Sequence, residues 1–283
     1  MRYRRRRRQR TQPGTSETNM GDSVDLRDRA AAVTGGASGI GRAIAELLAE
    51  RGARVTVGDI DYPEGVRSAL AAQGIEVLDC DVTREPQVEA LVEHAARGTG
   101  QLDIAIHSAG VGMVGPITER SGADWDHCLD VNVKGAYLLS RAAVPWMRRA
   151  GGGALVFIAS NAGLLPRAHD PVYSTSKGAL LALMRSVGLC HAGERIRCNA
   201  VCPGPVGQTR MMDEQLDAAP DRDAAVQALL AASPFAEACG RMITPREIAE
   251  AVLYLVSDAA LFVTGTALAI DGGKSLGVPA RRI

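Results

Sequence analysis

Short apolar runs alternate with longer amphipathic stretches from Arg29 almost to the end of this 283-residue chain. The apolar runs have the length of buried strands, and the stretches between them have the period of helices. Strands joined by crossover helices form parallel sheets, because a short hairpin cannot connect a parallel pair. The sequence therefore predicts an α/β fold: a single-domain Rossmann-type doubly wound parallel sheet of about seven strands, with helices on both faces. The predicted strands are 30–33, 54–57, 75–78, 102–106, 154–159, 197–201 and 267–270.

Helices are predicted between these strands, and one long segment lacks a regular pattern. The longest predicted helix holds residues 125–149, and another carries Tyr173. Residues 205–243 show no sustained period, so we expect an irregular segment there. Nothing in the pattern divides residues 23–283, which are expected to form one domain. The other predicted helices are 41–50, 63–73, 85–97 and 246–257.

Charge is unevenly distributed although the formal net charge is zero. Residues 1–19 hold seven arginines and one acid, so the rest of the chain is net acidic. We expect residues 1–22 to be a disordered arginine-rich tail, and no apolar segment marks it as a secretory signal. An acidic body does not favour nucleic-acid binding, and no apolar run is long enough to span a membrane.

The six cysteines are scattered without a Cys-x-x-Cys pair. Cys198 and Cys202 are the nearest two, and side chains four apart in a strand are too distant for easy bridging. Buried free thiols in a reducing compartment are the favoured interpretation, which predicts a cytoplasmic location. The five histidines show no ligand spacing, so no metal site is predicted.

A glycine-rich turn, Thr34-Gly-Gly-Ala-Ser-Gly-Ile-Gly41, joins the first predicted strand to its helix. Glycine lets the backbone approach a pyrophosphate, which the amides and dipole at the helix start can bind. Asp59 follows the second strand, where it can accept hydrogen bonds from the adenosine ribose. It would repel a 2′-phosphate and Ser38 offers no cation, so NAD is favoured over NADP. The alternative is a steric βα turn beside a solvated aspartate.

A serine, a tyrosine and a lysine follow the fifth predicted strand. Ser160 ends that strand, while Tyr173 and Lys177 lie four residues apart in a helical run and so share one face. A free tyrosine has a pKa of about 10, and a nearby ammonium group lowers that pKa. Such a tyrosine can exchange a proton with an oxygen that the serine hydroxyl holds. The pair could equally be an ordinary surface pair, so the rest of the chain must decide.

Glycine, acidic and hydroxyl residues follow the carboxyl ends of successive predicted strands. In an open parallel sheet that edge is where ligands bind. Their convergence favours a binding site over a series of unrelated turns. The residues are Gly35, Asp59, Asp81, His107 to Gly110, Ser160 and Pro203-Gly204.

From about Val24 to Val278 the chain resembles the short-chain dehydrogenase/reductase family, in its shorter, single-domain subtype. The glycine-rich turn matches the family's T-G-x-x-x-G-x-G motif. Ser160, Tyr173 and Lys177 match its Ser-x12-Tyr-x3-Lys set, and Asn132 matches its helix asparagine. Three shorter motifs also match: Asp81-Val82, Pro203-Gly204 and Ile270-Asp-Gly-Gly273.

The resemblance implies an NAD-dependent oxidoreductase that transfers a hydride between nicotinamide and a secondary alcohol or its ketone. Tyr173 would be the acid/base, and Lys177 would lower its pKa and hold the nicotinamide ribose. Ser160 would orient the substrate oxygen, and Asn132 would complete a proton relay. The implied cofactor contacts are Gly35, Ser38, Gly39, Ile40, Gly41, Asp59, Asp81, Val82, Ser108, Gly110, Tyr173, Lys177, Pro203, Gly204, Val206 and Thr209.

Two positions depart from the family pattern. His107-Ser-Ala-Gly110 replaces the family's Asn-Asn-Ala-Gly. Ser108 still offers a hydroxyl to the cofactor, and His107 is expected to pack and hydrogen-bond beneath the sheet edge. In Pro203-Gly-Pro-Val-Gly-Gln-Thr209 the threonine comes one position late, so either Gln208 or Thr209 contacts the nicotinamide carboxamide.

Two further functions stay open. A non-catalytic dinucleotide-binding sensor or scaffold could dock an acidic partner through the arginine-rich tail, although such proteins usually lose the tyrosine or the lysine. The tail could also bind nucleic acid, which the acidic body opposes. The favoured partner is a small, partly apolar alcohol or ketone, selected near Met113, after Ser160, and by a lid at 205–243. A homo-oligomer, either tetramer or dimer, is implied by the resemblance alone.

Overall fold

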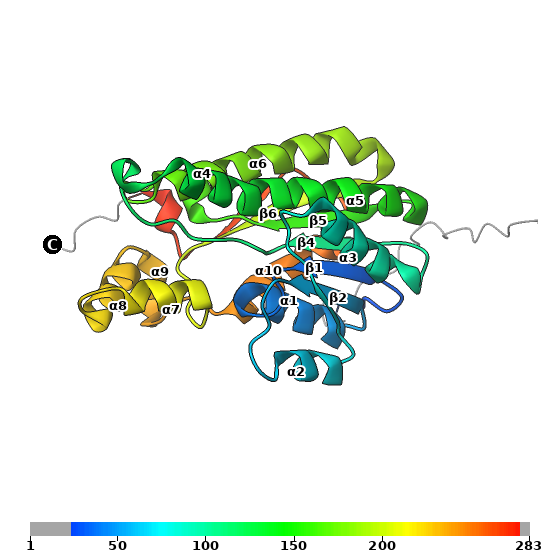
Figure 1. The fold of residues 1–283 in the computed structure, drawn as a ribbon, viewed down its shortest axis with the longest axis horizontal. Coiled ribbons are helices and arrows are strands. Elements are labelled where there is room, and N and C mark those ends of the chain that lie inside the picture. The colour runs from blue at the N-terminus through cyan, green and yellow to red at the C-terminus, as the bar shows by residue number, and fades with distance from the viewer. Residues whose placement is uncertain (1–23, 278–283) are drawn as a thin grey trace, which may run out of the picture.

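Seven parallel strands form one sheet in the computed structural model, which describes residues 24–277 (Figure 1). Their spatial order is β3-β2-β1-β4-β5-β6-β7, so the chain order reverses between β1 and β4. The predicted doubly wound sheet is confirmed, while the predicted tail at 1–22 lies outside the described residues. The strands are β1 (Ala30–Thr34), β2 (Arg54–Asp59), β3 (Glu76–Asp79), β4 (Ile104–His107), β5 (Gly153–Ile158), β6 (Ile196–Pro203) and β7 (Ala267–Ile270).

Helices cover both faces of the sheet, as parallel connections require. Figure 1 shows α4, α5 and α6 on one side of it, with α1, α2 and α10 on the other. Within residues 24–277, no helix combines the length and apolar character that a membrane span requires. These helices are α1 (Gly39–Glu50), α2 (Val66–Ala72), α3 (Glu85–Arg97), α4 (Gly122–Leu129), α5 (Gly135–Ala150), α6 (Pro171–His191) and α10 (Pro245–Val256).

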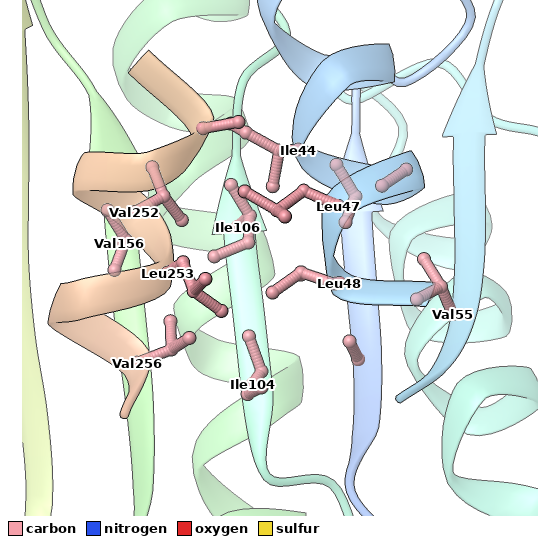
Figure 2. Packing of buried hydrophobic residues seen from close by; sticks show 14 of the residues in the cluster. Ile44, Leu47, Leu48, Val55, Ile104, Ile106, Val156, Val252, Leu253 and Val256 are labelled. Carbon is pink, nitrogen blue, oxygen red and sulfur yellow. The ribbon is translucent and has the colours of Figure 1, made fainter. Parts of the chain in front are cut away.

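Alternate residues along the strands point to opposite faces of the sheet and belong to two hydrophobic clusters, one on each face. Figure 2 shows the first, in which Ile44, Leu47 and Leu48 of α1 point toward α10 and the sheet. Their i, i+3, i+4 spacing gives α1 its apolar stripe. Phe157 of β5 lies in the second cluster with no exposed surface. Burying each such side chain contributes about 1.5–3 kcal/mol. Burial therefore stabilises each strand in its place in the sheet, which determines where its carboxyl end lies.

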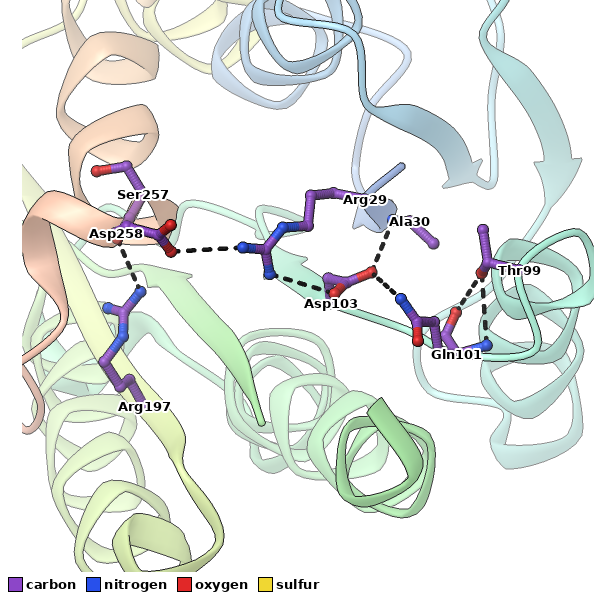
Figure 3. Close-up of polar contacts among 8 residues, drawn as sticks. All are labelled: Arg29, Ala30, Thr99, Gln101, Asp103, Arg197, Ser257 and Asp258. Carbon is purple, nitrogen blue, oxygen red and sulfur yellow. Dashed lines mark hydrogen bonds and ion pairs between the residues drawn. The ribbon is translucent and has the colours of Figure 1, made fainter. Parts of the chain in front are cut away.

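At the amino ends of the strands, the buried carboxylate of Asp103 gathers several donors (Figure 3). It accepts hydrogen bonds from the Ala30 backbone nitrogen at 3.1 Å and from the Arg29 guanidinium at 3.3 Å. Arg29 also contacts Asp258, just beyond α10, at 3.4 Å. Arg197 of β6 donates to the carbonyl oxygen that precedes Asp258, at 3.3 Å. The amino edge is therefore joined by polar contacts from β1, β6 and the end of α10.

The helix predicted over residues 125–149 is interrupted. α4 ends at Leu129, a π-helical turn covers Asp130–Lys134, and α5 begins at Gly135. The Asn132 side chain in this turn both accepts from and donates to the backbone of Val111. Local periodicity could not reveal the interruption, because the contact that accompanies it comes from a loop twenty-one residues earlier in the chain. Wide turns of this kind often mark functional sites.

Residues 205–243 are largely helical, so the expected irregular segment was wrong. Figure 1 shows the three helices of this segment gathered at one end of the molecule. The side chains of Thr209 and Asp221 cap two of them, and Pro234 starts the third. The helices are short and lack the sustained apolar period on which the other predictions rested. They are α7 (Arg210–Asp217), α8 (Arg222–Ala231) and α9 (Pro234–Cys239).

The six cysteines are all free, as the sequence predicts. Four of them are buried, but Cys190 and Cys239 are exposed, so the expectation of burial was wrong for these two. Cys198 and Cys202 both lie in β6 and remain unbridged.

Candidate active site

The glycine-rich turn lies where the sheet order reverses, at the carboxyl end of β1. Gly35 has a φ of 68°, and a β-carbon there would stand 2.5 Å from the backbone nitrogen of Ala109. A β-carbon at Gly41 would collide with the carbonyl oxygen of Gly35. The turn thus depends on bare backbone at both positions, as close approach of a pyrophosphate also does.

The start of α1 and the end of β2 meet beside this turn. Ser38 precedes α1 in an extended conformation, and its side chain makes no capping bond. Asp59 Oδ2 accepts from the Ala37 nitrogen at 3.0 Å, and Oδ1 accepts from the Ile60 nitrogen at 2.8 Å. The carboxylate is therefore fixed at the edge of the turn, where it fits the ribose of a dinucleotide.

Asp81 and Val82 follow β3 at the same edge. Asp81 Oδ1 accepts from the nitrogen and hydroxyl of Thr83 at 2.9 and 2.7 Å. Burial raises the pKa of Asp81, but these bonds outweigh it, so the pKa lies below its usual value. Val82 is buried against Gly135, where a β-carbon would stand 3.0 Å from the valine side chain. This corner offers an ionised carboxylate beside an apolar surface.

Asn132 and Lys177 meet beside Gly110. A β-carbon at Gly110 would lie 3.2 Å from Asn132 Oδ1 and 3.4 Å from Lys177 Nζ. Asn132 Nδ2 donates to Ser176 Oγ at 3.0 Å and is fully buried. Ser108 Oγ faces the glycine-rich turn, 3.1 Å from the β-carbon position of Gly41. The loop after β4 therefore contacts both the turn and the helix that carries Tyr173.

Ser160, Tyr173 and Lys177 also converge at this edge. Ser160 is buried just after β5, and its Oγ accepts from the Ala162 nitrogen at 3.1 Å. Lys177 is 4% exposed, with Nζ donating to the Ile158 carbonyl at 3.0 Å. The same Nζ lies 5.6 Å from the centroid of the half-buried Tyr173 ring. The predicted placement of Tyr173 and Lys177 on one face of a helix is confirmed.

The pKa of Tyr173 is raised, contrary to the expected lowering. Burial is the largest cause, while a hydrogen bond with Ser160 and the charge of Arg167 oppose it. Burial lowers the pKa of Lys177 itself to about 8. At neutral pH the tyrosine therefore keeps its proton and the lysine keeps its charge.

The loop after β6 contacts the glycine-rich turn from the other side. A β-carbon at Gly204 would stand 2.9 Å from the Cα of Asp271. The turn at Pro203-Gly204 therefore packs closely against the end of β7. Val206 is buried and pairs with Ile243. Thr209 Cγ2 lies 3.2 Å from the β-carbon position of Gly39.

His107 is fully buried at the end of β4, as expected for a packing residue. Its Nδ1 lies 3.1 Å from Thr34 Oγ1, and its ring stands edge-on to Phe157. Burial, and then the charge of Lys177, lower the pKa of His107 to about 3. The imidazole is therefore neutral at physiological pH.

Several polar residues near the site were missed by the sequence predictions. Arg167 donates to Asn161 Oδ1 at 2.6 Å and to Asp170 Oδ2 at 3.2 Å. Ser176, the partner of Asn132, was also missed. One local signal was present, since an arginine and an aspartate three apart stand just before Pro171, a favoured first residue of a helix.

Comparisons with known proteins agree with this architecture. The family model described as Enoyl-(Acyl carrier protein) reductase matches residues 35–275. Cis-4-hydroxycyclohexanecarboxylate dehydrogenase of Sinomonas cyclohexanicum is 40% identical over 87% of this chain and 96% of its own. 2-(S)-hydroxypropyl-CoM dehydrogenase 3 of Xanthobacter autotrophicus is 38% identical over 88% of this chain and 98% of its own.

Solved structures are similar over almost the whole chain. The ligand-free aldohexose dehydrogenase of Thermoplasma acidophilum has a TM-score of 0.83 and 32% identity, covering 92% of this chain and 100% of its own. A putative short-chain dehydrogenase/reductase from Burkholderia xenovorans has the same TM-score and identity over 91% of this chain. This chain therefore belongs to the short-chain dehydrogenase/reductase family and is an oxidoreductase that acts on CH–OH groups.

Proposed function

We propose that this enzyme interconverts a secondary alcohol and its ketone with NAD, using Tyr173 as the acid/base. A bound nicotinamide supplies the hydride acceptor or donor. Ser160 Oγ donates a hydrogen bond to the substrate oxygen, and Tyr173 Oη exchanges the proton of that oxygen. Lys177 holds the nicotinamide ribose. Asn132, whose Nδ2 donates to Ser176 Oγ on the same helix as Lys177, completes a proton relay.

The observation that carries this proposal is the buried Lys177 ammonium, 5.6 Å from the centroid of the Tyr173 ring, whose hydroxyl hydrogen-bonds with Ser160. A lysine that is 4% exposed and bonded to a carbonyl oxygen is costly, and such groups concentrate at functional sites. Because Tyr173 keeps its proton at neutral pH, it is ready to donate to a carbonyl. We therefore expect ketone reduction to be favoured near neutral pH and alcohol oxidation to accelerate as pH rises.

Preference for NAD over NADP rests on Asp59. Its two oxygens are held by the amides of Ala37 and Ile60, which fixes the carboxylate at the end of β2. A 2′-phosphate placed there would meet a like charge, which costs several kcal/mol. The cofactor contacts named from the sequence are proposed as a set, with Thr209 rather than Gln208 near the carboxamide. Thr209 packs against Gly39, whereas Gln208 is exposed with a φ of 57°.

The substrate class is a small alcohol or ketone with an apolar portion. The first two relatives take their names from a hydroxycyclohexanecarboxylate and a hydroxypropyl compound, both alcohols. We propose residues 205–243 as the lid that selects the substrate. Met211 of α7 lies 3.5 Å from the β-carbon position of Gly112, so the lid meets the loop after β4.

The direct test is turnover with a panel of secondary alcohols and ketones, supplied with NAD or NADP. Reduced nicotinamide absorbance should change with NAD and far less with NADP. In Asp59→Ala the ratio of the two kcat/KM values should move toward NADP by about tenfold or more. Dinucleotide binding without turnover across the whole panel would favour the sensor or scaffold instead.

Location and assembly are proposed from surface and thiol chemistry. Six free cysteines fit a reducing cytoplasm. Trp125, Tyr137 and Leu189 are exposed on α4, α5 and α6, the side that would pair in a homotetramer or dimer. Light scattering of the purified chain tests assembly, and a monomer at micromolar concentration would contradict it.

A further inference from the structure

An ion pair between the part-exposed Arg167 and the buried Asp170 spans the loop that joins Ser160 to Tyr173. Arg167 extends one terminal nitrogen to Asp170 Oδ2 at 3.2 Å and the other to Asn161 Oδ1 at 2.6 Å. Asn161 directly follows Ser160, and Asp170 immediately precedes α6, three residues before Tyr173. One side chain therefore fastens both ends of this loop.

The acceptors of Arg167 are withdrawn from solvent. Asn161 is 2% exposed and Asp170 is 4% exposed. Asp170 Oδ1 also accepts from Ser174 Oγ at 3.2 Å, and that hydroxyl accepts from the backbone nitrogen of Arg167 at 3.3 Å. A buried carboxylate is strongly destabilising once its cation is removed, so the arginine and the aspartate behave as one unit.

The contact with Asn161 continues to Ser160. Asn161 Oδ1 lies 3.4 Å from Ser160 Oγ, the hydroxyl proposed to hold the substrate oxygen. Because a guanidinium can only donate, Arg167 fixes the oxygen of the Asn161 amide, and not its nitrogen, toward the serine. A substrate oxygen that accepts from Ser160 must take this proton from the Asn161 oxygen, so Arg167, which holds that oxygen in place, sets the direction from which the serine proton moves.

The two members of this ion pair also shift the pKa of Tyr173 in opposite directions. Burial is the largest influence and raises the pKa of Tyr173, and the hydrogen bond with Ser160 lowers it. Arg167 lowers this pKa further, and Asp170 raises it. Other titratable groups near the two residues are His169 beside Asp170, Cys128 of α4, Lys177 of α6 and Lys274 beyond β7.

We propose that Arg167, acting through Asn161 and Asp170, is a positioning residue that keeps Ser160 and the first turn of α6 in the geometry for proton transfer. This inference rests on the functions proposed above for Ser160 and Tyr173. Arg167 touches neither reacting hydroxyl directly; it holds the residues beside them. A misplacement of about 1 Å in an active site can cost about 10²-fold in rate, so a loop fastened at both ends matters for kcat.

Arg167→Met tests the proposal, because methionine is long and flexible but has neither charge nor donors. We expect kcat to fall by about 10- to 100-fold while KM changes by less than about threefold. The rising limb of the pH profile for alcohol oxidation should move to higher pH, because a positive charge near Tyr173 is lost. Arg167→Lys keeps the charge but reaches one acceptor, so kcat should fall less and the limb should stay in place.

Arg185→Met is the matched control, because Arg185 is an exposed arginine on α6, the helix that follows the Arg167 loop. It should leave kcat, KM and the pH limb unchanged. A wild-type kcat and pH limb in Arg167→Met would overturn the proposal, and so would a loss confined to KM, which would indicate substrate binding. If circular dichroism shows Arg167→Met unfolded, Arg167→Lys decides: a reduced kcat with an unmoved limb supports positioning, and a wild-type kcat overturns it.

Tyr173→Phe, assayed alongside, separates the two proposals. A fully active Tyr173→Phe would remove the proposed function itself. An inactive Tyr173→Phe together with an unaffected Arg167→Met would leave that function standing and remove only the positioning role.

Discussion

Both edges of the sheet bury charge, but they compensate it differently. At the amino edge Asp103 is 2% exposed and bonded to the guanidinium of Arg29 and to a backbone amide. At the carboxyl edge Lys177 is 4% exposed and donates to a carbonyl oxygen. Among residues 24–277 no carboxylate lies within ion-pair distance of its Nζ. The paired charge joins strands, whereas the unpaired one is retained at a cost to stability.

The difference teaches where stability and activity reside. Among the groups at or near the carboxyl edge with displaced pKa values, the pKa of Lys177 lies near 8, that of Tyr173 is raised, and that of His107 lies near 3. Burial is the leading cause in each case. Proteins keep such costly groups where chemistry needs them. Substitutions at the two edges should therefore separate into losses of turnover and losses of folding free energy.

The largest effect is expected at the carboxyl edge, in Tyr173→Phe. Loss of the hydroxyl removes the proton donor and acceptor, so kcat should fall by about 10³-fold. The ring remains, so the unfolding midpoint should stay close to that of the wild type. Steady-state assays and urea denaturation measure the two quantities. Tyr254→Phe, at an exposed tyrosine of α10, is the control and should alter neither. A Tyr173→Phe enzyme with full kcat would break the assignment of activity to this edge.

The opposite outcome is expected at the amino edge, in Asp103→Ala. Removing the carboxylate leaves Arg29 and the Ala30 amide without their buried acceptor, so the unfolding free energy should fall by about 3 kcal/mol. The kcat of the folded protein should not change. Urea denaturation at neutral pH measures the loss. Asp258→Ala removes an exposed carboxylate that also contacts Arg29, and should cost less than about 1 kcal/mol. Equal losses in the two variants would contradict the contrast between buried and exposed pairs.

The sequence predicted what depends on local pattern. The parallel doubly wound sheet, the glycine-rich turn and the shared face of Tyr173 and Lys177 follow from periodicity and from glycine at fixed spacing. The observed strand ends lie within a few residues of the predicted ones, because the apolar runs must be buried and this leaves few alternative strand positions. The same pattern placed Asn132 on a helix, but not in a π-helical turn.

What the sequence could not predict depends on contacts between distant segments. The raised pKa of Tyr173 comes from burial, which exists only after β5, α6 and their loop have packed. The Arg167 pair with Asn161 needs a loop conformation that no period encodes. The short helices of residues 205–243 carry caps, at Thr209 and Asp221, but too few turns to show an apolar stripe.

A smaller effect is expected from His107, which lies beneath the carboxyl edge. Its pKa near 3 in the folded chain is well below the value of about 6.5 for an unfolded histidine. The unfolded chain therefore binds the additional proton between these values, and folding stability falls as pH drops below about 6.5. The slope from this group is at most about 1.4 kcal/mol per pH unit.

His107→Asn should remove that slope while leaving the carboxyl edge otherwise intact. Urea denaturation at several pH values between 7 and about 4 measures it. His127→Asn, at an exposed histidine of α4, should keep the wild-type slope. A wild-type slope in His107→Asn would mean that other groups account for the loss of stability in acid.

The smallest effect is expected at Glu247, near the start of α10, whose other end lies in the amino-edge contacts. The Glu247 carboxylate accepts hydrogen bonds from the Arg241 guanidinium and the Thr244 backbone amide, and these bonds lower its pKa to about 2. A carboxyl whose folded pKa lies below its unfolded value stabilises the fold above that unfolded value, and this contribution fades as pH falls from about 4.5 toward 2. Because the side chain is 44% exposed, solvent screens the pair, and Glu247→Gln should cost less than about 1 kcal/mol at neutral pH. Denaturation curves should show the wild type and the variant converging in acid, with kcat unchanged. A constant difference at every pH would mean that the glutamate acts through packing rather than through charge.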